Sequence, residues 1–218
     1  MEQYLANISQ QVEDGFTVPT DGNKFSRWCP EQLNQEQASV RLLKLHGSLD
    51  WHWVIHREHQ KISSLLARGT LESLEESVLL GGNSSSDHWE VNDRSVLLVG
   101  SYNKTERYTS GVFGEVFWHA RREIMGTPRL LVCGYGFRDV GVNLLLVDWA
   151  SGNPDGRLVV LAHRGVDELT AKMDPWMRRW YKVLGTEGVL RSIEHVSIQD
   201  LSWSDHIAPC LQKTASSQ

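Results

Sequence analysis

Two short runs of the chain hold the residues whose types and spacing could do chemistry. The first is Lys44-Leu-His46-Gly47-Ser48-Leu-Asp50-Trp51, in which a histidine follows a strand-like apolar run and precedes a glycine. Because histidine titrates near neutral pH, His46 at the end of a strand could act as a general base. A histidine that merely occupies a turn is the simpler interpretation of this residue taken by itself.

The second run follows an apolar segment at residues 129–133 and reads Gly134-Tyr135-Gly136, with Asp139 and Asn143 further along. In open parallel sheets, ligands bind beyond the carboxyl ends of the strands. Glycines there let the backbone approach a phosphate, and a following helix N-terminus offers N–H groups. The spacing does not fit the dinucleotide fingerprint, whose third glycine would stand at position 139. Tight-turn glycines and an N-cap at Asp139 therefore remain open alternatives.

A third group consists of His52, His56 and His59, a spacing that could hold a metal ion on a helix. Residues 51–55 look extended instead, and no carboxylate or cysteine stands at a matching spacing. Arg57 would also oppose a cation. We interpret the three as surface histidines and expect no metal.

The elements that must position these residues alternate along the second half of the chain. Apolar runs predict strands and a 3.6-residue periodicity predicts helices. The predicted strands are 95–100, 129–133, 157–162 and 193–198, and the predicted helices are 113–124, 140–149 and 175–184. Such alternation predicts right-handed crossovers and a sheet covered on both faces. The expected fold class is α/β, a Rossmann-like three-layer domain with a mostly parallel sheet.

The first half of the chain is less regular. A helix is predicted over residues 1–11 and strands over 40–45 and 49–55. Polar residues dominate between about 56 and 94, where one helix is expected at 71–80. We interpret this span as a polar insertion in a single domain of residues 1–218.

Composition sets bounds on the class of protein. The 218 residues are 40% hydrophobic and 22% charged, which is typical of one globular domain. A net charge of −5 disfavours non-specific binding of nucleic acid, so that partner is not expected. Apolar runs fall far short of the ~20 residues of a membrane span, and no signal peptide is evident. Three well-separated cysteines exclude a disulfide framework and favour a cytoplasmic location.

Taken together, the two runs resemble motifs of the sirtuin-like domains of bacteria, the silent-information-regulator type found in antiphage defence proteins. The run around His46 resembles the histidine-glycine motif of that family. The run from Gly134 to Asp139, with Asn143 downstream, resembles its glycine-tyrosine-serine-phenylalanine-x-aspartate motif and following asparagine. The resemblance extends over roughly residues 2–163.

The resemblance implies that NAD is the substrate. The family breaks the bond between nicotinamide and ribose, with water as the usual acceptor in defence proteins and an acyl-lysine in the protein-modifying branch. The four zinc-binding cysteines of that branch are not found here. The implied site residues are His46 as the catalytic base and, for NAD, Gly47, Ser48, Gly134, Tyr135, Gly136, Asp139 and Asn143.

The chain also departs from the family pattern. The first strand with its glycine-alanine-glycine loop is not found, nor is the threonine-asparagine-tyrosine-aspartate motif. Met1-Glu2-Gln3-Tyr4 resembles the family's sequence directly after that second motif. We therefore expect an N-terminally truncated member. Its exposed sheet edge would favour a homo-oligomer or a partner that supplies the strand. Gly136 stands where the family has serine.

The sequence thus predicts an NAD hydrolase of the bacterial defence type, which the truncation could leave inactive. Two alternatives stay open: a non-catalytic module that binds NAD or ADP-ribose or a partner, and an NAD-dependent protein deacylase. The enzymatic hypotheses require that His46 and the glycine bend at 134–136 face one nucleotide cleft.

Overall fold

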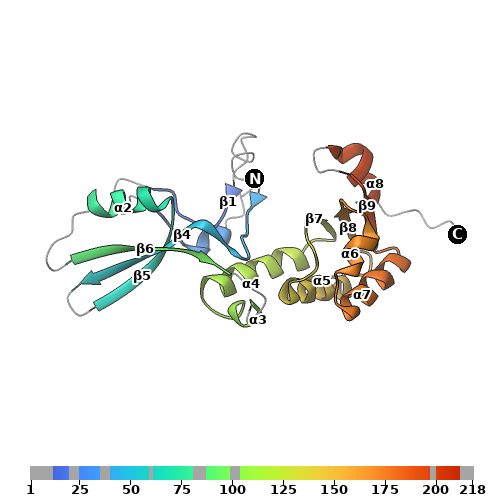
Figure 1. The fold of residues 1–218 in the computed structure, drawn as a ribbon, viewed down its shortest axis with the longest axis horizontal. Coiled ribbons are helices and arrows are strands. Elements are labelled where there is room, and N and C mark those ends of the chain that lie inside the picture. Colours follow the sequence, from blue (N-terminus) through green and yellow to red (C-terminus); the bar gives the residue numbers. More distant parts are fainter. Residues whose placement is uncertain are drawn as a thin grey trace. The chain divides into compact units, whose positions relative to one another are not determined.

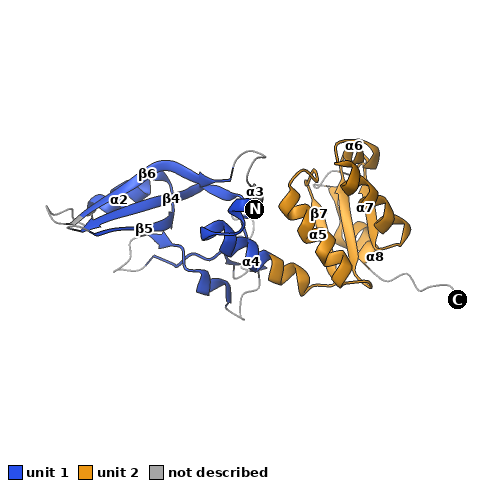
Figure 2. Cartoon of the chain, turned by 90° about the horizontal axis from the view of Figure 1, so that it is seen from below, with its two compact units in different colours: residues 1–120 blue, residues 121–218 orange. Residues whose placement is uncertain are grey.

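The computed structural model describes residues 12–19, 25–34, 40–58, 61–80, 87–98, 104–196 and 200–211. The chain divides into two compact units, unit 1 (Met1–Ala120) and unit 2 (Arg121–Gln218), as Figure 2 shows. The boundary falls within one helix, α4 (Gly111–Met125). Each unit is described by itself.

Unit 1 is built mainly of strands (Figure 1). Four of them form an antiparallel sheet in the order β2-β5-β4-β6, and β1 pairs with β3 in parallel. The elements before α4 are β1 (Val12–Glu13), β2 (Ser26–Arg27), the 3-10 helix η1 (Pro30–Asn34), β3 (Val40–Arg41), β4 (Gly47–Glu58), β5 (Lys61–Arg68), α2 (Leu71–Leu80), β6 (Asp87–Leu97) and α3 (Lys104–Arg107).

The span predicted as a polar insertion forms most of this antiparallel sheet together with α2, which has its predicted bounds. Leu74 and Val78 of α2 pack against Val54 and Ala67 in a small core. Ile62 on β5 is 70% exposed. The span is polar on average because antiparallel strands can bury one face and leave the other in water.

Unit 2 contains a parallel sheet in the order β7-β8-β9, with an unbroken register in both ladders. Helix α5 joins β7 to β8, and α6 and α7 join β8 to β9. The elements are β7 (Arg129–Cys133), α5 (Val140–Gly152), β8 (Arg157–Ala162), α6 (Val166–Ala171), α7 (Pro175–Thr186), β9 (Leu190–Glu194), the π-helix η3 (Trp203–Ile207) and α8 (Ala208–Leu211).

The side chains of β8 alternate between two cores. Leu158 and Val160 pack with α5 and α7 on one face, and Val159 packs with Ile207 and Leu211 of η3 and α8 on the other. Each fully buried aliphatic side chain of this size contributes about 1.5–3 kcal/mol. The parallel sheet therefore lies between two helical layers, which confirms the α/β class and its Rossmann-like three-layer arrangement.

Two expectations about strands are wrong in detail. The apolar run of β7 predicted a strand buried on both faces, but Leu131 is 42% exposed and Cys133 is exposed. Within the described part of the chain, β7 pairs with β8 alone and is an edge strand. The last strand starts at Leu190 instead of residue 193, because Gly188 (φ 73°) ends the preceding helical turn and Leu190 fills the core.

Other expectations fall outside what the structure describes. The helix predicted over residues 1–11 lies outside the described residues. A homo-oligomer or a partner that supplies the missing sheet strand stays a prediction. None of the helices among the described residues is long and apolar enough to cross a membrane.

Candidate functional site

His46 lies in the turn between β3 and β4. The N–H of Gly47 donates to the carbonyl of Lys44 at 3.0 Å, and the His46 carbonyl accepts from the N–H of Leu98 at 2.9 Å. Gly47 has a φ of 76°, and a Cβ there would stand 2.0 Å from the carbonyl oxygen of Val96. Only glycine fits this position, which fixes the histidine at the start of β4 with its side chain exposed.

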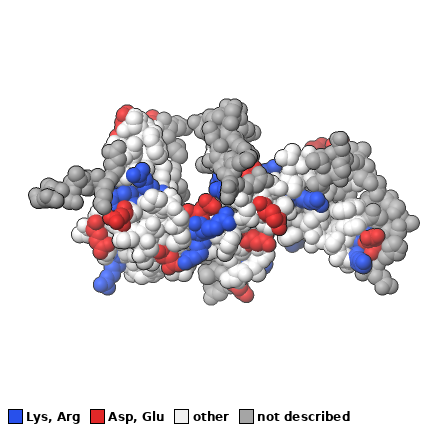
Figure 3. All heavy atoms as spheres, turned by 180° about the vertical axis from the view of Figure 1, so that it is seen from behind, with Lys and Arg blue, Asp and Glu red and all other residues white. Residues whose placement is uncertain are grey.

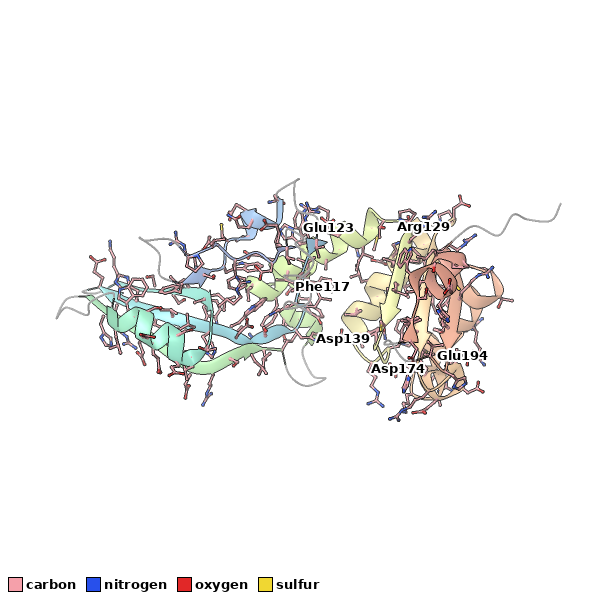
Figure 4. All side chains as sticks on the ribbon, turned by 90° about the horizontal axis from the view of Figure 1, so that it is seen from above. Phe117, Glu123, Arg129, Asp139, Asp174 and Glu194 are labelled. Carbon is pink, nitrogen blue, oxygen red and sulfur yellow. The ribbon has the colours of Figure 1, made fainter. Side chains whose placement is uncertain are left out.

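A buried tyrosine holds the imidazole of His46. The Nε2 atom of His46 lies 2.9 Å from the hydroxyl oxygen of Tyr108, which is 6% exposed. The Tyr108 ring stacks on Phe117 of α4, which is labelled in Figure 4. The ring centroids are 4.4 Å apart and the ring planes differ by 18°. The histidine thus combines an exposed ring with a partner anchored in the core.

Ser48 belongs to a polar network at the start of β4. Its Oγ accepts from Nζ of Lys44 at 2.8 Å, and the same ammonium lies 3.3 Å from Oδ1 of Asp50. In the structure, Gly47 closes the turn and Ser48 holds Lys44. The predicted contacts of these two residues with NAD stay predictions.

The glycine bend directly follows β7. Gly134 has a φ of 67°, where any residue with a side chain is strained, and a Cβ at Gly134 or Gly136 would meet no atom within 4 Å. Phe137 also has a left-handed φ of 54°, but its side chain has no exposed surface. The bend is therefore anchored by a buried ring on one side and open on the side of its glycines.

Polar side chains brace the bend from behind. The hydroxyl of Tyr135 is 2.9 Å from the carbonyl of Asp139 and 2.8 Å from Oδ1 of Asn143, both of which accept from it. The amide of Asn143 donates to the carbonyl of Phe137 at 3.0 Å. Oδ1 of Asp139 accepts from the N–H of Val142, which confirms the N-cap interpretation. Direct contact of Asp139 or Asn143 with NAD stays a prediction.

A cavity of about 610 Å³ opens at the carboxyl edge of the unit 2 sheet, within the size range of small-molecule sites. Figure 4 shows Asp139 and Glu194 at this edge and Arg129 at the opposite one. The ends of β7 and β8, helix α6 and one residue after β9 line the cavity. The lining residues are Cys133, Gly134, Tyr135, Gly136, Leu161, Ala162, His163, Arg164, Gly165, Glu168, Leu169, Lys172 and Val196.

Two cations and one carboxylate lie on the rim of this cavity. Glu168 accepts from Nζ of Lys172 at 2.5 Å and from Nη1 of Arg164 at 3.2 Å. These hydrogen bonds, that of Lys172 first, lower the pKa of the Glu168 carboxyl. The Glu194 carboxylate lies beside Gly165, so two acidic side chains stand near the two basic ones, and acidic and basic side chains are also mixed over the face that Figure 3 shows.

The turn after β8 completes the cavity. Gly165 has a φ of 90°, and a Cβ there would stand 2.9 Å from Cε1 of His195. The N–H of His195 donates to the carbonyl of Ala162 at 3.2 Å, and the N–H of Val166 donates to the Glu194 carboxylate at 3.0 Å. These contacts join the ends of β8 and β9, so the side of the cavity formed by α6 has a defined position.

Sequence reasoning missed the residues that β8 and α6 contribute to the cavity. The signal was present, since His163 and Arg164 follow the next apolar strand at the same edge of a parallel sheet. Glu168 and Lys172 lie one and two helical turns further on. Their place in the cavity depends on the turn at Gly165, which the apolar pattern does not reveal.

The interpretation of the three histidines needs a correction. His52 is 4% exposed, and its Nδ1 lies 3.1 Å from the carbonyl oxygen of Asn92, so it is not a surface histidine. His56 stacks on Trp89 at a centroid distance of 4.1 Å, and His59 lies outside the described residues. Among the residues that the structure describes, no group of three His, Cys, Asp or Glu side chains could hold a metal ion.

A parallel three-layer unit with a cavity at the carboxyl edge of its sheet places unit 2 in the Rossmann-like class of domain. The family model of the SIR2-like domain matches residues 1–182, which include the run around His46 and the glycine bend. The chain therefore belongs to the SIR2-like domain family, which confirms the resemblance to sirtuin-like proteins. Its function at the level of the family is related to NAD, as substrate or ligand. A comparison with curated proteins finds no match.

The cavity and His46 lie in different units. All cavity residues belong to unit 2, and the His46 turn belongs to unit 1. The prediction that the histidine and the glycine bend face one cleft therefore stays a prediction.

Proposed function

We propose that the protein binds NAD and hydrolyses the bond between nicotinamide and ribose. The cavity at the carboxyl edge of the unit 2 sheet is the observation that carries this proposal. Its chemistry suits the adenosine diphosphate half of NAD. Lys172, Arg164 and the open glycine bend suit the phosphates, and Leu161 and Val196 offer an apolar wall for the base.

His46 is the proposed general base. As the bond to nicotinamide breaks, its electron pair leaves with nicotinamide, which departs as a neutral molecule, and positive charge develops on the ribose. Water attacks the ribose carbon that carried nicotinamide, and the proton that water loses passes to the imidazole of His46. The products are nicotinamide and ADP-ribose. In this proposal Gly47 and Ser48 present the base, and Tyr135, Asp139 and Asn143 shape the bend.

The test is nicotinamide release by purified protein incubated with NAD. We expect His46→Ala to lower the rate by about 100-fold or more, the range typical of a general base, while the protein stays folded because the side chain is exposed. His88→Ala, at another exposed histidine in unit 1, is the matched control and should leave the rate unchanged. Equal rates for His46→Ala and the wild type would remove His46 from its role.

A second candidate function is binding without cleavage. The cavity is lined by unit 2 alone, so ADP-ribose could bind there without any residue of unit 1. Calorimetry would then show ADP-ribose binding that Lys172→Ala weakens and His46→Ala does not, with no release of nicotinamide from NAD. Product analysis separates hydrolysis from deacylation, because an acyl-lysine peptide would yield acyl-ADP-ribose in place of ADP-ribose. Membership of a bacterial defence system stays a prediction.

A further inference from the structure

We propose that Tyr108 is a positioning residue that orients His46 for catalysis. The inference rests on the proposed hydrolysis, in which His46 is the base. The hydroxyl oxygen of Tyr108 lies 2.9 Å from Nε2 of His46, and the planes of the two rings differ by only 18°. Both residues belong to unit 1. The tyrosine thus touches the base, and in this proposal it acts on the substrate through His46.

Tyr108 is well placed to hold a neighbour in position. Its ring is 6% exposed and stacks on Phe117 of α4 at 4.4 Å. The same helix packs Val112 and Val116 against Trp51 in the core beneath β4. Since His46 stands at the start of β4, helix α4 links the tyrosine to the strand that carries the base.

The chemistry of a phenol suits a base that gains and loses a proton. A tyrosine hydroxyl both donates and accepts. In imidazolium, Nε2–H donates to the Tyr108 oxygen. In the neutral ring that acts as the base, Nε2–H keeps this bond and the bare Nδ1 is the atom that takes the proton from water. The hydrogen bond therefore survives both protonation states, and no proton passes from Tyr108 to the substrate. Loss of this bond would remove one restraint on the rotamer of the exposed imidazole.

The test replaces only the hydroxyl. Tyr108→Phe keeps the ring that stacks on Phe117, so the fold should persist. Tyr181→Phe is the matched control, because it also removes a hydroxyl from a buried tyrosine, whose partner is Ser192 in unit 2 at 2.6 Å. Imidazole nitrogens are observed in long-range ¹H–¹⁵N spectra at fixed pH, and the signals that His46→Ala removes identify His46.

We expect Tyr108→Phe to shift the Nε2 resonance of His46 and Tyr181→Phe to leave it in place. We also expect Tyr108→Phe to lower kcat for nicotinamide release about tenfold, the effect of one hydrogen bond on an activation barrier, with KM for NAD unchanged. Phe117→Leu, which keeps the hydroxyl but removes the stacked ring, should shift the same resonance less.

An unmoved Nε2 resonance in Tyr108→Phe would overturn the inference whatever the activity, and so would a shifted resonance with an unchanged kcat. If the wild type releases no nicotinamide, the proposed function is overturned instead. The Nε2 resonance then still shows whether Tyr108 and His46 form the hydrogen bond. If Tyr108→Phe does not fold, Phe117→Leu decides in its place, and an unmoved resonance there overturns the inference.

Discussion

The side-chain amide of Asn143 donates to the carbonyl oxygen of Phe137 at 3.0 Å, from a position with no exposed surface. Phe137 has a φ of 54°, and such a backbone conformation costs a residue with a side chain about 1–3 kcal/mol. Oδ1 of the same amide accepts from the hydroxyl of Tyr135 at 2.8 Å. One buried asparagine therefore holds two points of the glycine bend and stabilises its strained residue.

We expect Asn143→Ala to lower the free energy of unfolding by about 2–3 kcal/mol, because it leaves the Phe137 carbonyl and the Tyr135 hydroxyl without this amide. Urea unfolding followed by tryptophan fluorescence measures the loss. Asn153→Ala is the control: its amide also bonds a backbone carbonyl, that of Trp149 at 3.0 Å, but at a half-buried helix end. Equal losses in the two variants would contradict the special role of Asn143.

The two glycines of the bend should respond differently to substitution. Gly134→Ala places a side chain at a φ of 67° and should cost about 1–2 kcal/mol in the free energy of unfolding. Gly136→Ser meets no atom within 4 Å at its Cβ and should leave stability unchanged. Because Gly136 lines the cavity, we expect the added hydroxyl to raise ADP-ribose affinity about fivefold in calorimetry, the effect of one new hydrogen bond. Weaker binding by Gly136→Ser would contradict the proposed place of the phosphates.

Cys133 offers a chemical probe of the cavity. It is exposed and lines the cavity, whereas Cys29 and Cys210 are half-buried and lie outside its lining. At a concentration of ADP-ribose near ten times its Kd, alkylation of Cys133 by iodoacetamide should slow about tenfold, because only the free protein reacts. Peptide mass spectrometry follows all three cysteines, and the other two serve as internal references. Alkylation of Cys133 at an unchanged rate, with ligand binding shown separately, would place the ligand elsewhere.

Local signals in the sequence predicted the elements of unit 2 well. The bounds of β7 and β8 match the prediction because turn residues bracket each apolar run, Gly126-Thr127-Pro128 before the first and Gly156 before the second. The edge position of β7 was not predictable in this way, since it depends on which strands pair. The burial of His52 likewise follows from a neighbour, because its Nδ1 meets β6, a strand 40 residues away.

In the candidate site, too, features set by adjacent residues were predictable and features set by distant contacts were not. The glycine after β7 and the N-cap at Asp139 were predictable because both roles depend on a few adjacent residues. The partner of His46 was not, because Tyr108 is separated from it by 62 positions and reaches it through the packing of α4. The residues of α6 in the cavity depend on the joined ends of β8 and β9, which are also distant in sequence.

Tyr181 should make the protein sensitive to alkaline pH. Burial raises the pKa of its phenol and the nearby Glu194 carboxylate raises it further, although the hydrogen bond with Ser192 lowers it in part. With the folded pKa above the unfolded one, the neutral phenol stabilises the fold fully below pH about 10, and this contribution is lost as pH rises through the folded pKa. Urea unfolding between pH 8 and pH 11 should therefore show a falling free energy in the wild type and a shallower fall in Tyr181→Phe. The same slope in both proteins would mean that other groups cause the alkaline loss.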